Sequence, residues 1–403
     1  MAASRLTSLL AHPHLIDAIV PAPPDLARRL ADRLRAGGLD SDLAAEIGLQ
    51  SELRWAGRAK YGPAATRMLY TRNGLEQGTR LAVAAHHARR FREAGCTSVA
   101  DLGCGLGVDS LALAGLGLRV IAIERDPDTA ACARHNLAAF PEVSVLEADV
   151  TAIDIEALGA EGYFADPARR EGSTRLSHPN QWSPPLDTVL SWSRLGPLGV
   201  KLAPGIAYEM LPADSETQWV SVDGEVVEAT VWCGDLAAQP ARSALVIRGD
   251  RAHAWTIEGD PSAPPLLADP AADLGEYLFE PDGALIRAGG VAHLAERLHA
   301  HPVYPRVAYL TGDAPLPASC AVFAKAWRVL DVVSLKTKKL KAAMRAWDAG
   351  AVTIKKRGVD VSPENLRRRI VYPKGEQAVT LICTRVGSRH VAVRVEEVPP
   401  ATA

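Results

Sequence analysis

Three glycines at alternate positions follow a short apolar run near residue 100, in the stretch V-A-D-L-G-C-G-L-G from Val99 to Gly107. The apolar residues before Gly103 are typical of the end of a buried strand, and a helix is expected from about Asp109. Glycine at 103, 105 and 107 lets the backbone adopt positive φ and approach a ligand closely. A strand, a glycine turn and a helix N-terminus together predict a site for a polar ligand at the end of an α/β sheet.

The charge beside this turn restricts the ligand. The spacing is G-x-G-x-G and not the G-x-G-x-x-G of dinucleotide sites, and Asp101 lies two residues before the first glycine. A carboxylate there would repel a pyrophosphate and would pair with an amine or a sulfonium. This favours S-adenosylmethionine, which carries positive charge and no phosphate, over a nicotinamide dinucleotide.

The glycine turn resembles motif I of the class I S-adenosylmethionine-dependent methyltransferases, and two further acids follow in the order of that family. Glu124 ends an apolar run and can accept both ribose hydroxyls. The resemblance implies that Asp149, in E-A-D-V, binds the adenine together with Val150. For each acid alone, a helix cap or a solvated strand end is the alternative. The expected cofactor-binding residues are Asp101, Gly103, Gly105, Gly107, Glu124, Asp149 and Val150.

The order of elements predicts an α/β fold with three parts. The 403 residues are enough for two or three domains. We expect a helical N-terminal region over 1–80, a methyltransferase domain with a Rossmann-like sheet over 81–260, and a basic C-terminal α+β domain over 271–403, after a Pro- and Ala-rich linker. The strands of the Rossmann-like sheet are expected near 98–102, 118–123, 143–147, 161–165 and 198–203.

The pattern changes beyond Glu209. Short apolar runs are separated by Asp223-Gly224 and Gly234-Asp235, both typical of hairpin turns. Further along, Y-L-F-E-P-D-G-A-L-I from Tyr277 and T-I-K-K-R-G from Thr353 resemble the THUMP-like domain. That domain follows a methyltransferase domain in bacterial proteins of this type.

The fourth expected strand runs into D-P-A-R at Asp166. In class I enzymes the methyl-accepting atom lies beyond the end of this strand. Asp166 can accept an N–H bond from a base, and Pro167 stiffens the loop. The stretch resembles the D-P-P-aromatic motif of base N-methyltransferases such as trimethylguanosine synthase, although Ala168 and Arg169 replace the second Pro and the aromatic residue. The candidate catalytic residues are Asp166, Pro167 and Arg169, with salt bridges to neighbouring carboxylates as the alternative for Arg169.

Several residues are candidate substrate contacts. Trp182 can replace the missing stacking residue, or it is a buried structural Trp. Gln77 and Thr79 precede a helix, and a similar segment closes over the S-adenosylmethionine site in trimethylguanosine synthase-like enzymes, although Thr79 can be a plain N-cap. Lys201, in G-V-K-L-A-P-G, is either a substrate contact or an edge charge. No cluster has metal-ligand spacing, so no metal is expected.

Charge is concentrated near the C-terminus. From Lys325 to Lys374 the chain has 14 Lys and Arg against 4 Asp and Glu, a local net charge of +10 in a chain of net charge −2. Such a local excess predicts a surface for a polyanion, and RNA is the expected partner. Lys355, Lys356 and Arg357 form a basic turn within it.

The sequence therefore predicts a methyltransferase that N-methylates a base in structured RNA (tRNA or rRNA). Two alternatives stay open: a methyltransferase of small molecules or proteins, and an RNA-binding protein with a degenerate S-adenosylmethionine site. Six scattered cysteines without a C-x-x-C pair favour a reduced, cytoplasmic location. No run of 18 apolar residues exists, so no membrane span is expected. The oligomeric state is left open.

Overall fold

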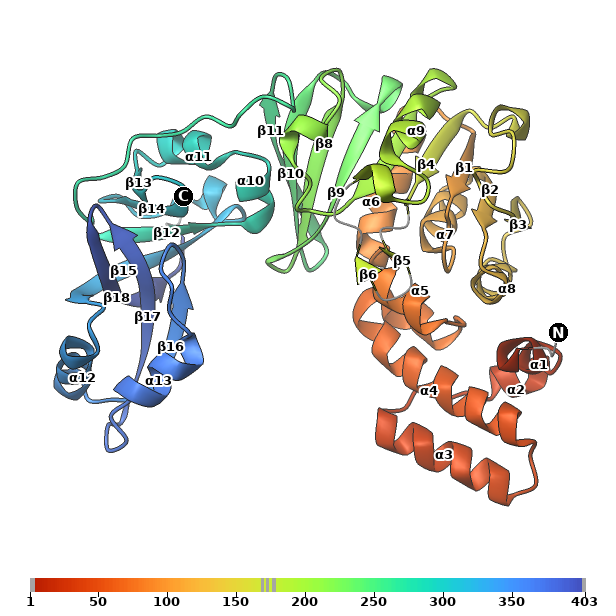
Figure 1. The fold of residues 1–403 in the computed structure, drawn as a ribbon, viewed down its shortest axis with the longest axis horizontal. Coiled ribbons are helices and arrows are strands. Elements are labelled where there is room, and N and C mark those ends of the chain that lie inside the picture. Colours follow the sequence, from red (N-terminus) through yellow and green to blue (C-terminus); the bar gives the residue numbers. More distant parts are fainter. Residues whose placement is uncertain (1–3, 168–169, 172–173, 176–178, 401–403) are drawn as a thin grey trace. The chain divides into compact units, whose positions relative to one another are not determined.

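The computed structural model describes residues 4–167, 170–171, 174–175 and 179–400 (Figure 1). The chain divides into two compact units. The first consists of Met1–Leu202 and Thr230–Ala238, and the second of Ala203–Ala229 and Gln239–Ala403.

Helices form the N-terminal part of the first unit. They are α1 (Arg5–Leu10), α2 (Pro13–Asp17), α3 (Pro24–Ala36), α4 (Ser41–Tyr61), α5 (Arg72–Gln77) and α6 (Leu81–Glu93). Helices α3 and α4 pack side by side (Figure 1), and a Cβ atom at Gly48 would lie 2.9 Å from the Cβ of Ala31. The small residues at this crossing therefore allow close helix packing.

Five parallel strands follow, in the order β7-β4-β1-β2-β3. They are β1 (Ser98–Leu102), β2 (Arg119–Glu124), β3 (Val143–Glu147), β4 (Gly162–Ala165) and β7 (Leu198–Leu202). The helices among them are α7 (Val108–Gly115), α8 (Pro127–Asn136) and α9 (Leu186–Ser191), and a short antiparallel pair joins β5 (Arg170–Glu171) to β6 (Thr174–Arg175). All five strands lie where the sequence predicted them. Because they are parallel, their carboxyl ends meet at one edge of the sheet, where ligands bind in such folds.

The helices and the parallel sheet share one hydrophobic core, which runs from Leu6 through Phe91 to Phe164. Asn136 joins the helical part to the glycine turn. Its side-chain oxygen accepts from the backbone N–H of Leu69 at 2.8 Å, and its amide donates to the carbonyl of Leu106 at 3.0 Å. The position of the glycine turn therefore depends on the N-terminal helices.

Two hairpins were expected after β7, and only the first is confirmed. Strands β8 (Glu216–Val222) and β9 (Glu225–Cys233) are joined by Asp223-Gly224, both at positive φ (51° and 87°), as a tight hairpin turn requires. The second prediction, at Gly234-Asp235, is wrong. Strand β10 (Ala241–Arg248) pairs in parallel with β8, and its antiparallel partner is β11 (Arg251–Glu258). The misleading turn residues belong to a short 3₁₀ segment that lets the chain cross to the far side of β8.

A seven-stranded sheet forms the C-terminal part of the second unit, in the order β13-β14-β12-β15-β18-β17-β16. Its strands are β12 (Tyr277–Pro281), β13 (His301–Tyr304), β14 (Val307–Gly312), β15 (Ala324–Ser334), β16 (Ala349–Lys356), β17 (Gln377–Val386) and β18 (Arg389–Val398). The helices are α10 (Gly283–Arg287), α11 (Val291–Arg297), α12 (Thr337–Ala346) and α13 (Pro363–Ile370). Leu340 and Met344 of α12 and Leu366 of α13 pack in one hydrophobic cluster with the sheet. Because one face of each of these two helices is buried against the sheet, the basic residues on the other face are exposed to solvent.

Replacing Gly107 by alanine tests the packing behind the glycine turn. Gly107 has φ 79°, and a Cβ atom there would lie 2.7 Å from the Cδ1 of Leu137, which is only 2% exposed. Gly105 has φ 56° and no atom within 4 Å of such a Cβ, so Gly105→Ala is the matched control. We expect Gly105→Ala to lower the free energy of unfolding by about 1–2 kcal/mol, and Gly107→Ala to lower it by at least about 1 kcal/mol more. Urea unfolding measures both, and equal losses would contradict the packing described here.

Candidate functional site

The glycine turn bends sharply because one carbonyl holds two of its amides. The backbone N–H groups of Gly103 and Cys104 both donate to the carbonyl of Ile123, each at 2.9 Å. Gly103 has φ 90°, and a Cβ atom there would lie 3.2 Å from the carbonyl oxygen of Asp166. Glycine therefore allows the end of β1 to approach the end of β4 closely.

Glu124 fixes the same turn from the end of β2. One carboxylate oxygen accepts from the N–H of Gly105 at 3.1 Å, and the other accepts from the N–H of Asp126 at 2.8 Å. The carboxylate therefore lies at the carboxyl edge of the sheet, beside the glycine turn.

Asp149 lies after β3 and is half-buried. Its carboxylate accepts from the backbone N–H and the hydroxyl of Thr151, at 2.8 and 2.7 Å, and these bonds lower the pKa of Asp149. Arg125 approaches the other oxygen at 3.9 Å. Asp149 thus shapes its own loop, while the neighbouring Val150 is half-buried.

Asp101 is 1% exposed and accepts a hydrogen bond from the hydroxyl of Ser110 at 2.6 Å. Burial raises the pKa of Asp101 to about 7, and the negative charges of Asp109 and Asp166 add to this effect. The Ser110 bond and the charge of Lys201 act in the opposite direction. The turn therefore holds an acid whose charged form is disfavoured, mainly by burial and then by the neighbouring carboxylates.

Asp166 follows β4, and its backbone N–H donates to the carbonyl of Leu102 at the end of β1, at 3.3 Å. Its carboxylate is paired with Lys201 of β7 at 2.7 Å. The next residue, Pro167, is buried, and Arg169 lies outside the described residues. The structure thus brings Asp166 next to the glycine turn.

Lys201 is a feature that the sequence analysis did not resolve. Its side chain is buried, and besides Asp166 the ammonium contacts the hydroxyl of Thr79 at 3.0 Å and the carbonyl of Gln77 at 3.3 Å. The sequence could have indicated this role, because a lysine inside an otherwise apolar, buried strand needs a buried partner.

His87 extends the same network and was not predicted. Its Nδ1 lies 2.8 Å from Asp109 Oδ1, and its ring packs against Phe164 and Trp232. Burial acts to raise the pKa of Asp109, but the hydrogen bond and charge of His87, together with Lys201 and Thr79, lower it below its usual value. Thr79 also bonds to Asp109, so its hydroxyl stands between Lys201 and this acid.

The remaining candidate substrate contacts are Trp182 and the basic turn formed by Lys355, Lys356 and Arg357. Trp182 is 6% exposed, which fits a packed indole better than an open stacking surface. Lys355 pairs with Glu280 and lies 5.0 Å from the ring centroid of Trp327, while Arg357 donates to the carbonyl of Ala308 at 2.9 Å. The third residue of the basic turn, Lys356, is exposed.

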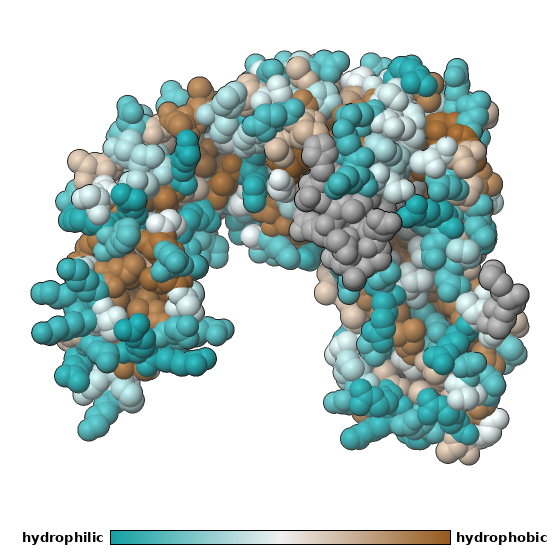
Figure 2. All heavy atoms as spheres, viewed as in Figure 1, coloured by the Kyte–Doolittle hydropathy of each residue, from teal (hydrophilic) through white to brown (hydrophobic). Residues whose placement is uncertain are grey.

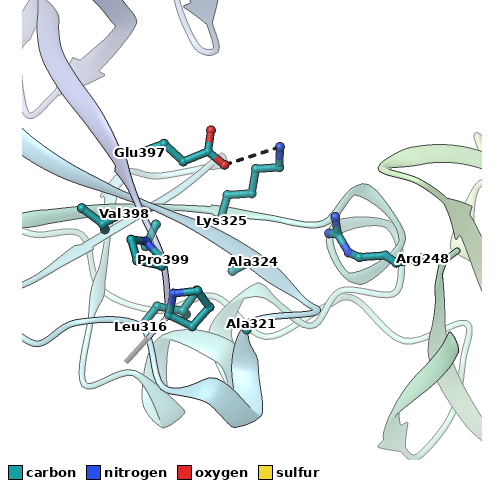
Figure 3. Close-up of a pocket in the computed structure, with 10 residues that line it drawn as sticks. Arg248, Leu316, Ala321, Ala324, Lys325, Glu397, Val398 and Pro399 are labelled. Carbon is teal, nitrogen blue, oxygen red and sulfur yellow. Dashed lines mark ion pairs between the residues drawn. The ribbon is translucent and has the colours of Figure 1, made fainter. Parts of the chain in front are cut away.

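A pocket of about 420 Å³ lies in the second unit near the C-terminal end of β18 (Figure 3). Its charged lining residues are Arg248, Lys325 and Glu397, and the last two approach to 3.8 Å. Arg248 itself donates to the carbonyl of Val322 at 3.0 Å. These cations already have partners in the protein.

The structure describes the side chains and helices of residues 4–167 and 179–400, together with the short strands 170–171 and 174–175. Among them, no group of three or more His, Cys, Asp or Glu side chains is arranged to hold a metal ion. In the same ranges, no helix combines the length and apolarity needed to cross a bilayer.

The chain is similar to known proteins along most of its length. It is 32% identical over 330 residues to two proteins from strains of Mycobacterium tuberculosis, each named an uncharacterized S-adenosylmethionine-dependent methyltransferase; the match covers 80% of this chain and 86% of theirs. Residues 324–397 match the family described as THUMP domain-like. A crystal structure of a protein from Porphyromonas gingivalis W83, named as a methyltransferase, has a TM-score of 0.73 at 23% identity, covering 95% of this chain and 98% of that one.

Replacing Asp101 by asparagine tests its electrostatic setting. Because the pKa of Asp101 is higher in the folded chain than in the unfolded one, the native state is favoured below pH 4 and this advantage is lost as the pH rises toward 7. Between pH 5 and pH 8, wild type should therefore lose roughly 1–3 kcal/mol of stability relative to Asp101→Asn. Urea unfolding across this range measures the difference. Asp187→Asn, at the exposed start of α9, should show no such trend, and a pH-independent difference for Asp101→Asn would refute the assignment.

Proposed function

The chain belongs to the S-adenosylmethionine-dependent methyltransferases, and from that premise we propose that it methylates a base nitrogen in structured RNA. The observation that carries the proposal is the contact between the glycine turn and Asp166. A Cβ atom at Gly103 would lie 3.2 Å from the carbonyl oxygen of Asp166, and the Asp166 N–H donates to the carbonyl of Leu102, the last residue of β1, at 3.3 Å. A cofactor cradled by the turn would thus have the Asp166 carboxylate close to its reactive end.

The residues around the turn suit a cationic nucleotide. Asp101 is buried there, its pKa is raised mainly by burial, and Asp109 and Asp166 add negative charge beside it. Glu124 presents two carboxylate oxygens at the same edge. We assign Asp101, Gly103, Gly105 and Gly107 to the turn that holds S-adenosylmethionine, Glu124 to its ribose, and Asp149 and Val150 to its adenine.

Methyl transfer requires a nitrogen held in line with the sulfonium carbon. When bound, S-adenosylmethionine supplies the methyl group: the new N–C bond forms, the C–S bond breaks with its electron pair remaining on sulfur, and the nitrogen loses one proton. We assign the Asp166 carboxylate the role of accepting the N–H of the base and directing that proton toward solvent. The carbonyl of Pro167 offers a second acceptor, and Arg169 a phosphate contact.

The basic helices of the second unit support RNA as the substrate. Lys338, Lys341 and Arg345 lie on one face of α12 by their spacing and are exposed. Arg368 and Arg369 of α13 are exposed as well. Figure 2 shows hydrophilic side chains gathered around this end of the second unit. Such a density of cations favours a polyanion over a small neutral substrate.

The catalytic assignment is tested by transfer of tritium from labelled S-adenosylmethionine to total RNA from cells that lack the protein. Wild type should incorporate label, and Asp166→Ala should reduce the rate by at least about 100-fold. Asp187→Ala, an exposed acid of α9, is the matched control and should transfer label like wild type. The proposal fails if wild type incorporates no more label than Asp166→Ala. Binding of S-adenosylmethionine without any transfer would identify the degenerate-site alternative.

The RNA-binding assignment is tested by charge reversal. The triple change of Lys338, Lys341 and Arg345 to Glu should weaken RNA binding and reduce the slope of log affinity against log salt by about 0.7–0.9 for each phosphate that the variant no longer neutralises. The same number of reversals at exposed Arg28, Arg29 and Arg33 of α3 controls for net charge. Filter binding at salt concentrations from about 50 to 200 mM covers the range over which phosphate binding changes affinity by orders of magnitude. Equal effects of both triples would contradict a specific role for α12.

A further inference from the structure

Lys201 joins the reactive end of the site to the segment Gln77–Thr79, which precedes α6. The ammonium has three N–H donors. It contacts Asp166 Oδ2 at 2.7 Å, Thr79 Oγ1 at 3.0 Å and the Gln77 carbonyl at 3.3 Å. The lysine is 5% exposed and the Asp166 side chain 28% exposed, so the contacts of this ammonium are less screened by water than those of a surface ion pair.

The same segment is held from its other side by a second lysine. The ammonium of Lys60 donates to the carbonyls of Leu75, Glu76 and Gly78, at 2.7, 2.7 and 3.1 Å. These carbonyls end helix α5, where cations stabilise the free C=O groups. The two ammonium groups thus satisfy four successive carbonyls, from Leu75 to Gly78.

Close packing fixes the backbone at Gly78 as well. A Cβ atom there would lie 2.3 Å from the hydroxyl of Tyr61 and 2.9 Å from the carbonyl oxygen of Gly74. At the far end of the segment, Thr79 is 4% exposed and bonds to Asp109. Displacement of the Lys201 ammonium would therefore disturb the segment and Asp166 together.

We propose that Lys201 is a positioning residue that couples the orientation of Asp166 to the placement of Gln77–Thr79. This proposal rests on the proposed function, in which Asp166 receives the N–H of the base. Lys201 takes one carboxylate oxygen, Oδ2, so the base nitrogen is directed to Oδ1. Because the same ammonium holds Thr79 and Gln77, a substrate that shifts Asp166 also shifts the segment beside it.

The coupling is tested by hydrogen exchange over residues 75–80 in the full chain, with Lys201→Met and Asp166→Asn. Lys201→Met keeps the aliphatic stem and removes the ammonium, and exchange in the segment should become at least about tenfold faster. Asp166→Asn should also speed exchange in this segment, because it removes the carboxylate charge that holds the Lys201 ammonium in place. Wild-type exchange in both variants would overturn the proposal.

A second pair of variants guards against general misfolding. Thr79→Val removes the hydroxyl that Lys201 contacts, whereas Thr79→Ser retains it, so faster exchange in the first and slow exchange in the second support the proposal. Equal exchange in the two would contradict it. In the methylation assay, Lys201→Met should lower kcat by at least about tenfold, with little change in the affinity for S-adenosylmethionine. If wild type does not methylate RNA, the proposed function fails while the exchange results still decide the coupling.

Discussion

The carbonyl of Ile123, which accepts the N–H groups of both Gly103 and Cys104, determines the path of the chain between β1 and α7. Glycine at positive φ is required for that path, and its lack of a side chain lets β1 and β4 approach at Asp166. Asn136 joins the turn to the N-terminal helices by bonding to Leu69 and Leu106. The helical part is therefore a structural part of the candidate site and not a separate attachment.

Buried charge is the second constraint on this site. Asp109 and Asp166 add negative charge near Asp101, whereas the positive charge of Lys201 acts against this effect and His87 bonds to Asp109. Burying such groups is unfavourable unless they are paired. Under the proposed function, a positively charged cofactor held by the glycine turn would offset part of the negative charge around Asp101.

The sequence was informative where a residue type alone restricts the backbone or the charge. The strand ends and the positions of Asp101, Glu124 and Asp166 could be predicted, because alternating strands and helices place such residues at one edge of a sheet. Lys201 was ambiguous, because neither its burial nor its partners can be read from G-V-K-L.

Other details depended on contacts that no local pattern contains. Gln77 meets Lys201 through its backbone carbonyl, a contact that does not depend on its side chain. The turn at Gly234 was misread because hairpin residues say nothing about which strand becomes the neighbour. Lys355 and Arg357, which the sequence predicts as substrate contacts, also bind groups within the protein, and these partners cannot be read from the basic run.

The most direct test of the account is a crystal structure of the full chain with S-adenosylhomocysteine. The account predicts that the ribose hydroxyls bind the carboxylate of Glu124, that the ligand backbone follows the turn at Gly105, and that the sulfur faces Asp166. A ligand bound elsewhere, or one whose sulfur points away from Asp166, would contradict it.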